Sequence, residues 1–319
     1  WWGSTKSRIP RSAAAATMDV AHTTLAERAT RELVARRPLR GRVVALAATN
    51  GAGYTAVDHV LREAGATTVE HMHGSGGYNW YGGRESPASF MCVWTEPEAR
   101  VLRPVRPCLV AGMPRTLVLR PRQLVVPRRV LLLSNYVHRD WAHIGRFPTE
   151  PFQDELLRVA ALLREAYGAD VRFRWRPHPA DDPAAVARGA SRVPFVEVSR
   201  GRALAEDLDA CDVLVSGQST ALVEAVLGGV PFFVHVTPDT ESDLVWVPEE
   251  RRFFRAEELV ARFGPWVEAL RRRDERAGEA DVRARQALLG ASGRALSLSE
   301  GLAEIAGRDG AAKAVAASR

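Results

Sequence analysis

Residues 212–236 read DVLVSGQSTALVEAVLGGVPFFVHV, and this stretch decides the fold class. Asp212–Ser216 is a short apolar run typical of a buried strand, and Pro231–Val236 is a second one. Between them, Thr220–Leu227 has the length and composition of a helix. A strand, a helix and a strand in so short a stretch predict a βαβ unit with parallel strands.

The same alternation continues on both sides of this unit. In the second half of the chain, further strands are expected at Val130–Ser134, Val171–Trp175 and Phe195–Val198, with helices at Phe152–Tyr167, Ala203–Ala210 and from about Glu257 to Leu289. In the first half, strands are expected at Arg42–Ala48, Thr67–Met72, Phe90–Trp94 and Cys108–Ala111, with helices over 19–37 and 54–63. This pattern predicts an α/β fold with one parallel sheet in each half.

The proline-rich segment 113–129 separates the two halves and is the expected linker. We therefore expect an abbreviated N-terminal Rossmann-like domain over 19–112 and a C-terminal Rossmann-like domain over 130–289. Residues 1–18 are expected to be a disordered tail, and 290–319, rich in Ala, Gly and Ser, a C-terminal tail.

Composition narrows the class of protein. The 319 residues are 46% hydrophobic and 26% charged, which excludes wholesale disorder. No apolar run approaches the roughly 20 residues that span a bilayer. The net charge of +6 comes from arginines spread among acids, a pattern typical of solvated helix faces. Three distant cysteines, Cys92, Cys108 and Cys211, exclude a disulfide framework and a cysteine-based zinc site and favour a reducing cytosol.

The first motif closes a strand and reads RWRPHP over residues 174–179. Pro177 and Pro179 fix the backbone on both sides of His178. A rigid imidazole near the guanidinium groups of this motif, including that of Arg176, suits a phosphate. A turn histidine without a ligand explains the same pattern.

The second motif lies between the strand and the helix of the βαβ unit and includes Ser216 and Gly217. Ser219 and Thr220 fall at the helix start, where backbone N–H groups and the helix dipole favour an anion. These hydroxyls either cap the helix or bind a phosphate. Glu224 lies one helical turn further on and is either a ribose ligand or an ordinary surface acid.

The third motif reads EHMHGSGGY over residues 70–78 and ends a strand of the first half. His71 and His73 share one face of that strand, but no third ligand lies at a supporting spacing, so no metal site is expected. Glycines after His73 leave its ring accessible, which makes it a candidate general base.

A further glycine-containing turn, Asn50–Gly53, lacks the third glycine of a dinucleotide fingerprint and the ending of a P-loop. The chain also contains no Gly-x-Ser-x-Gly elbow. These absences disfavour oxidoreductase, ATPase and α/β-hydrolase functions.

Together, the three motifs resemble those of the GT-B glycosyltransferase superfamily, above all bacterial capsule and teichoic-acid polymerases and the sialyl- and Kdo-type transferases that use cytidine nucleotides. The Gln-His-Gly or Trp-His-Gly motif of those proteins corresponds to Met72-His73-Gly74, with methionine in first place. Their Arg-x-His-Pro motif matches residues 176–179, and their Ser-Ser/Thr pair matches Ser219-Thr220. The resemblance covers roughly residues 67–236 and implies two Rossmann-like domains whose parallel sheets face a central cleft, with the N-terminal half abbreviated.

The resemblance also implies a role for each matched residue. His178 would contact the donor phosphate and stabilise the leaving nucleotide without a bound metal, and His73 would deprotonate the acceptor hydroxyl. Glu224 would reach the ribose. The implied donor-nucleotide site comprises Arg176, His178, Ser216, Gly217, Ser219, Thr220 and Glu224, and the implied acceptor loop comprises Gly74, Ser75, Gly76 and Gly77.

The implied function is transfer of a sugar or polyol phosphate from a nucleotide donor, CMP- or CDP-linked, to a glycan or lipid-linked acceptor in cell-surface polysaccharide synthesis. No cofactor other than the nucleotide co-substrate and no nucleic-acid partner is expected. The expected location is the cytoplasm, with peripheral association at the inner face of the plasma membrane. Two alternatives stay open: a nucleotide-sugar 2-epimerase-like enzyme on the same fold, and a non-catalytic GT-B-like binding subunit or fragment.

Overall fold

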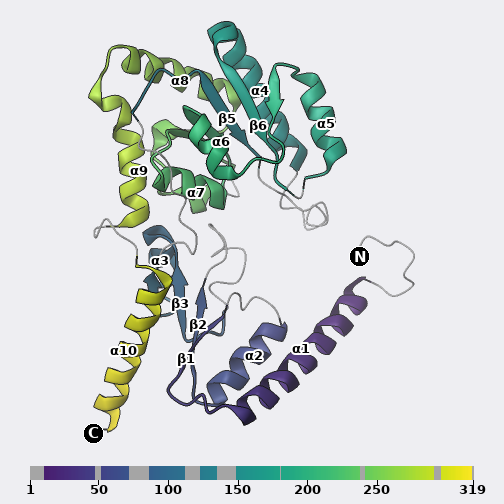
Figure 1. Cartoon of the computed structure of the whole chain (residues 1–319), viewed down its shortest axis with the longest axis vertical. Helices are drawn as coiled ribbons and strands as arrows, with labels where there is room; N and C mark the ends of the chain where they lie inside the picture. Colours follow the sequence, from purple (N-terminus) through teal and green to yellow (C-terminus); the bar gives the residue numbers. More distant parts are fainter. Residues whose placement is uncertain are drawn as a thin grey trace. The chain divides into compact units, whose positions relative to one another are not determined.

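The computed structural model describes residues 11–46, 52–71, 86–111, 123–134, 149–179, 181–237, 241–290 and 296–317. The chain divides into two compact units (Figure 1). The first unit combines Trp1–Arg115 with Leu289–Arg319, and the second is the continuous segment Thr116–Leu288. The chain therefore leaves the first unit, builds the second and returns.

The first unit contains a parallel sheet with the strand order β1-β2-β3-β4. Its strands are β1 (Val43–Leu46), β2 (Thr67–His71), β3 (Phe90–Val93) and β4 (Cys108–Val110). Its helices are α1 (Arg11–Arg36), α2 (Ala52–Glu63), α3 (Glu96–Leu102) and α10 (Leu298–Ala317). The sequence prediction of an abbreviated Rossmann-like first half agrees with this short sheet.

Alternate residues of this sheet feed two separate cores, because successive side chains of a strand point to opposite faces. On one face, Met91 and Val93 of β3 pack with Leu102 of α3. On the other face, Cys92 of the same strand packs with Ile305 of α10. Both faces are covered, which explains why β3 is apolar throughout and why even the polar residues of β2 are buried.

The second unit contains a six-stranded parallel sheet with the order β10-β9-β8-β5-β6-β7. Its strands are β5 (Arg129–Leu133), β6 (Arg172–Arg176), β7 (Val196–Val198), β8 (Val213–Ser216), β9 (Phe232–His235) and β10 (Arg252–Phe253). The α-helices are α4 (Thr149–Tyr167), α5 (Pro183–Arg192), α6 (Leu204–Ala210), α7 (Thr220–Leu227), α8 (Ala256–Arg271) and α9 (Glu279–Leu289). Short 3₁₀ turns are η2 (Gly168–Asp170), η3 (Glu241–Leu244), η4 (Glu249–Arg251) and η5 (Glu275–Gly278).

The order of strands reverses at β5. The chain proceeds from β5 to β6 and β7 on one side, then returns to place β8, β9 and β10 on the other. In open α/β sheets, ligands bind beyond the carboxyl ends of the strands at this reversal. The prediction of an α/β fold with two Rossmann-like units is confirmed.

The structure corrects the expectations for the two ends of the chain. Residues 11–18, expected to be a tail, belong to the helix α1, and residues 1–10 lie outside the described part. Residues 298–317, also expected to be a tail, form α10, whose Ile305 is fully buried against the first sheet. The C-terminal segment therefore belongs to the first unit and is not a tail that follows the second unit.

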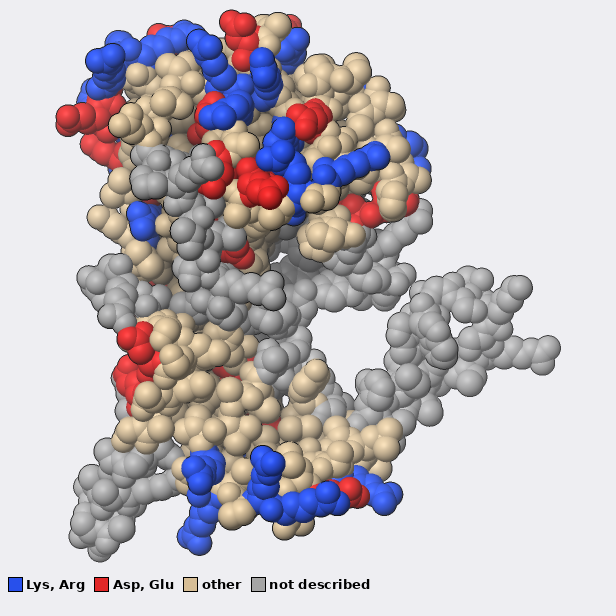
Figure 2. Space-filling model, in the orientation of Figure 1, with Lys and Arg blue, Asp and Glu red and all other residues tan. Residues whose placement is uncertain are grey.

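The charged side chains on the drawn face of the second unit are distributed as the sequence predicted for solvated helices. On the face shown in Figure 2, basic and acidic side chains are interspersed over the second unit rather than gathered in a patch of one sign. Of the helices that the structure describes, none combines the length and apolar character that crossing a membrane requires.

Candidate functional site

Three strand ends lie level with one another at the carboxyl edge of the second sheet, the edge at which its parallel strands finish. Leu133 of β5 pairs with Arg176 of β6 on one side and with Ser216 of β8 on the other. The backbone N–H of Ser134 donates to the Arg176 carbonyl oxygen at 3.1 Å. The motifs that follow β6 and β8 therefore share this edge, as the sequence analysis expected.

His178 sits in a tight turn just beyond β6. Its backbone N–H donates to Oδ2 of Asp181 at 2.8 Å, and the N–H of Asp181 donates back to the His178 carbonyl oxygen at 2.9 Å. Burial lowers the pKa of the half-buried His178 imidazole below 6.5. The ring is therefore neutral at neutral pH, so it can donate one hydrogen bond and accept another.

Ser219 is the N-cap of α7. Its backbone is extended, and its Oγ accepts a hydrogen bond from the Leu222 N–H at 3.0 Å. The first turn of a helix presents backbone N–H groups without carbonyl partners inside the helix, and its dipole favours an anion. The prediction that Ser219 caps the helix is thus confirmed. Ser219 orients the first turn of α7, which is the turn predicted to bind a phosphate.

The other predicted donor-site residues around α7 differ in exposure. Ser216 and Gly217 are buried, and the Ser216 hydroxyl donates to the Gly217 carbonyl oxygen at 2.9 Å. This hydrogen bond stabilises the loop between β8 and α7. Thr220 and Glu224 are half-buried on α7.

Next to this edge, the buried carboxylate of Asp207 forms ion pairs with three arginines. Asp207 of α6 lies 2.7 Å from Nη1 of Arg176, 3.1 Å from Nε of Arg202 and 3.5 Å from Nη1 of Arg174. The Ser199 hydroxyl donates to its Oδ2 at 2.6 Å. This cluster joins the end of β6, the loop after β7 and the start of α6, and thereby supports the turn that carries His178.

The cluster also shows the protein partners of Arg176. Its Nη1 donates to the Arg202 carbonyl oxygen at 2.8 Å as well as to Asp207. Its place in the donor site stays a prediction, and these two contacts fix the direction of its guanidinium group. Arg174 and Arg176 lie two residues apart on a strand and so share a face, but nothing in the sequence distinguished Asp207 from a solvated helix acid.

The predicted acceptor side of the site falls outside the described residues. His73 and the loop Gly74–Gly77 belong to the undescribed segment 72–85. The strand before them is described, and it ends at the buried His71, whose ring centroid is 6.3 Å from that of Trp94. The role of His73 stays a prediction.

The described residues contain no candidate metal site, because no group of three or more His, Cys, Asp or Glu side chains lies close enough together among them to hold a metal ion. The three cysteines are buried, and none of them forms a disulfide. Burial, with a smaller contribution from Cys108, raises the pKa of the Cys92 thiol to about 11, so Cys92 is a packing residue and not a nucleophile.

Comparison with known proteins finds no matching family model and no matching curated protein. Solved structures do match. A protein described as a UDP-N-acetylglucosamine 2-epimerase from Listeria monocytogenes matches with a TM-score of 0.53 at 13% identity, over 81% of this chain and 73% of that one. MurG from Acinetobacter baumannii matches with a TM-score of 0.51 at 12% identity, over 89% and 76%.

A mutant of TarM from S. aureus, in complex with fondaparinux, α-GlcNAc-glycerol and UDP, matches with a TM-score of 0.54 at 12% identity. The match covers 81% of this chain but only 54% of TarM, so this chain spans about half the length of that protein. At these identities the likeness establishes the fold. The neighbours are GT-B glycosyltransferases and an epimerase, and the chain has a GT-B-like α/β fold.

Proposed function

We propose that this chain is a glycosyltransferase that moves a sugar or polyol phosphate from a nucleotide-activated donor to a glycan or lipid-linked acceptor. The observation that carries the proposal is the carboxyl edge of the second sheet. There the turn of His178 and the capped start of α7 follow strands that flank β5, at the reversal of strand order.

The donor phosphates would lie at the start of α7. Backbone N–H groups of its first turn and the dipole of the helix stabilise negative charge, and Ser219 fixes their direction. The neutral His178 imidazole would donate a hydrogen bond to a phosphate oxygen. Charge that develops on the leaving nucleotide would thus meet donors already in place, an electrostatic contribution that needs no bound metal. His73 would act as the general base for the acceptor hydroxyl.

The donor base is proposed to be cytidine, on the strength of the motif resemblance around His178 and Ser219. The TarM complex contains UDP, so uridine is the competing choice. The expected setting is the cytoplasm, in agreement with three cysteines that form no disulfide, and association with the inner face of the plasma membrane is proposed for a lipid-linked acceptor.

A thermal-shift series with CMP, CDP, UDP and GDP tests donor binding. A ligand that binds only the folded state stabilises it by about 2.7 kcal/mol at roughly 100 times its dissociation constant. His178→Ala should weaken nucleotide binding by about tenfold or more, because a hydrogen bond to a charged phosphate is lost. His59→Ala, at an exposed histidine of the first unit, is the matched control. Equal affinities in both variants would contradict the donor site.

Labelled donors, supplied with and without acceptors, then separate the candidate functions. Turnover that requires an acceptor supports the transferase. Turnover without an acceptor favours the second candidate, a 2-epimerase-like enzyme, for which the similar fold of the Listeria protein is the motivating observation. Nucleotide binding without any turnover favours a non-catalytic binding subunit.

A further inference from the structure

The segment that joins α1 to β1 carries four arginines within a short stretch. Arg36 ends α1, and Arg37, Arg40 and Arg42 follow it before β1 begins at Val43. All four arginines are exposed. The segment leads to the edge at which the strands of the first sheet begin, opposite the edge at which they end.

Backbone hydrogen bonds hold this segment against the chain that leads into β2. The N–H of Gly41 donates to the Gly65 carbonyl oxygen at 2.9 Å, and the N–H of Thr67 donates to the Arg42 carbonyl oxygen at 2.8 Å. A Cβ on Gly65 would lie 3.1 Å from Cγ of Arg40, so the aliphatic stem of Arg40 packs over this glycine. The fold therefore fixes the backbone from which these charges project.

The positive charge of this region is not balanced by acids. Residues 23–46 contain six arginines and two acids, Glu27 and Glu32. Glu27 lies 2.9 Å from Nη2 of Arg31, and Glu32 lies 3.3 Å from Nε of Arg28. Among the described residues, no ion pair joins any of the other four arginines to an acid. The segment 36–42 therefore presents four positive charges to the solvent.

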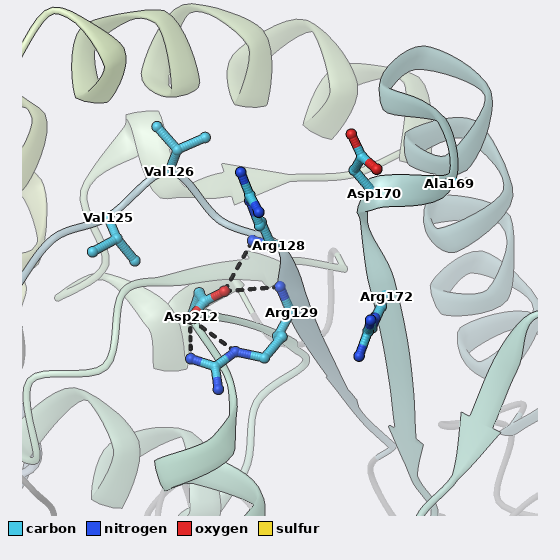
Figure 3. Close-up of a pocket in the computed structure, with 8 residues that line it drawn as sticks. All are labelled: Val125, Val126, Arg128, Arg129, Ala169, Asp170, Arg172 and Asp212. Carbon is cyan, nitrogen blue, oxygen red and sulfur yellow. Dashed lines mark hydrogen bonds and ion pairs between the residues drawn. The ribbon is translucent and has the colours of Figure 1, made fainter.

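Two arginine clusters of the second unit are organised differently. Asp212 accepts hydrogen bonds from the backbone N–H groups of Arg128 and Arg129, both at 2.9 Å, and from the Arg129 guanidinium (Figure 3). Asp207 pairs with three further arginines. The lower margin of the first unit in Figure 2, by contrast, shows several basic side chains and little acidic surface. Like charges placed together repel one another, and a negatively charged surface relieves that repulsion.

An apolar stripe on α1 adjoins these charges. Leu25, Ala29 and Leu33 are four residues apart, so they lie along one side of the helix. All three are exposed, Leu25 by 66% and Leu33 by 52%. Leu33 precedes Arg36 by one helical turn, so exposed apolar and cationic groups lie next to each other.

We propose that this surface of the first unit, Leu25–Arg42, docks on an anionic lipid bilayer. The arginines bind the phosphates of the headgroups, and Leu25 and Leu33 enter the apolar layer directly below. A nucleic acid also presents phosphates but offers no apolar layer to the leucines, so a bilayer fits both parts of the surface. The inference rests on the membrane association in the proposed function and names the surface responsible. It shares no residue with the proposed donor site.

The test is sedimentation of the full chain with phosphatidylcholine vesicles, either pure or doped with phosphatidylglycerol. Wild type should bind the doped vesicles in preference to the pure ones. Arg37→Gln/Arg40→Gln should lower the partition coefficient by roughly twentyfold or more, which is about fivefold for each arginine. Arg188→Gln/Arg285→Gln is the matched control, because it removes the same charge from exposed arginines of α5 and α9 and should leave binding unchanged.

The apolar stripe is tested in the same assay. Leu33→Asn should lower the partition coefficient by about threefold to tenfold, because less apolar surface leaves water. Val282→Asn, at an exposed valine of α9, is its control. Unchanged binding by Leu33→Asn would overturn insertion of the leucines.

Three results overturn the docking surface itself: wild type that does not bind the doped vesicles, unchanged binding by Arg37→Gln/Arg40→Gln, and equal losses in the two double variants. Preference for a DNA duplex over the vesicles would identify a nucleic-acid surface and overturn the lipid assignment. Thermal shifts with CDP and UDP separate this inference from the donor site. Wild type that binds vesicles but no nucleotide would contradict the donor site and support the docking surface.

Discussion

Asp207 is the residue on which most charge converges in the described part of the second unit. Its side chain is fully buried, and the arginines around it are 22–41% exposed. Asp207→Asn keeps the shape and removes the charge, so three guanidinium groups lose their common partner. We expect the free energy of unfolding to fall by about 2 kcal/mol or more, the low end of the cost of breaking a buried pair because water screens the arginines.

Chemical denaturation measures this loss, and Glu206→Gln is its control. Glu206 is the neighbouring acid on α6, is 59% exposed and lies 3.9 Å from Arg202. Its replacement should change the free energy of unfolding by less than about 0.5 kcal/mol. Similar losses in the two variants would show that Asp207 does not hold the cluster together.

Two histidines give the stability a pH dependence of predictable sign. Burial lowers the pKa of His178 and of His235, whose Nε2 lies 3.1 Å from the Phe254 carbonyl oxygen. Between the lowered folded pKa and the ordinary value of about 6.5, the unfolded chain binds more protons than the folded one. The contribution of these histidines to the free energy of unfolding should therefore be fully present above about pH 6.5. It should decrease as the pH falls through this window. Denaturation of wild type and His235→Asn from about pH 7.5 to 5 measures it, and an unchanged slope in the variant would refute the assignment.

At the residue scale, the sequence allowed us to predict the positions of residues that directly follow strands. His178 and Ser219 could be placed on one edge because the ends of parallel strands meet there. Asp207 could not be found, because an acid in an acid-rich helix has the same local pattern whether it faces water or three arginines. The ion pair between Arg176 and Asp207 could not be predicted for the same reason.

At the scale of elements, α10 is, like the shorter α3 and α5, a helix that was not predicted from the sequence. Its glycines lower its helix propensity, and its many glycines and alanines weaken the amphipathic pattern, so packing against the sheet contributes to its stability. A Cβ on Gly301 would lie 3.0 Å from Cβ of Ala111, whereas one on Gly307 would meet nothing within 4 Å. The small residue at 301 is therefore what lets the helix approach the sheet.

Alanine at these two positions should have opposite effects. Gly307→Ala should stabilise the protein by up to about 1 kcal/mol, the usual gain in an exposed helix interior. Gly301→Ala gains the same propensity but pushes α10 from the sheet, so we expect a net loss relative to Gly307→Ala of about 1–3 kcal/mol, the range for overpacking. Thermal denaturation of the pair measures the difference, and equal stabilisation by both would mean that α10 does not depend on close approach.

The βαβ elements, by contrast, could be predicted almost residue by residue. Thr220–Leu227 is α7 as expected, and the strands around it fall within the expected runs. Apolar strands covered on both faces leave a strong signal because every residue is selected for burial.

At the scale of the molecule, α10 belongs to the first unit although its sequence follows the second. Ile305 is fully buried in the core that α10 shares with the first sheet. Ile305→Ala should lower the stability of that unit by about 2–4 kcal/mol through lost contacts and the cavity left behind. Hydrogen exchange should show faster opening in β1–β4 and unchanged protection in β5–β9. A uniform loss across both sheets would mean that the units unfold together.

The return of the chain to the first unit also sets an order of assembly during synthesis. Residues 116–288 form one continuous stretch, so the second unit can complete its sheet as soon as that stretch has left the ribosome. The first unit, although translated earlier, must wait for Ile305 with the α10 face of its sheet uncovered. The half of the protein that is made first is therefore the half that finishes folding last, and until then its nascent sheet is the part that chaperones would have to protect.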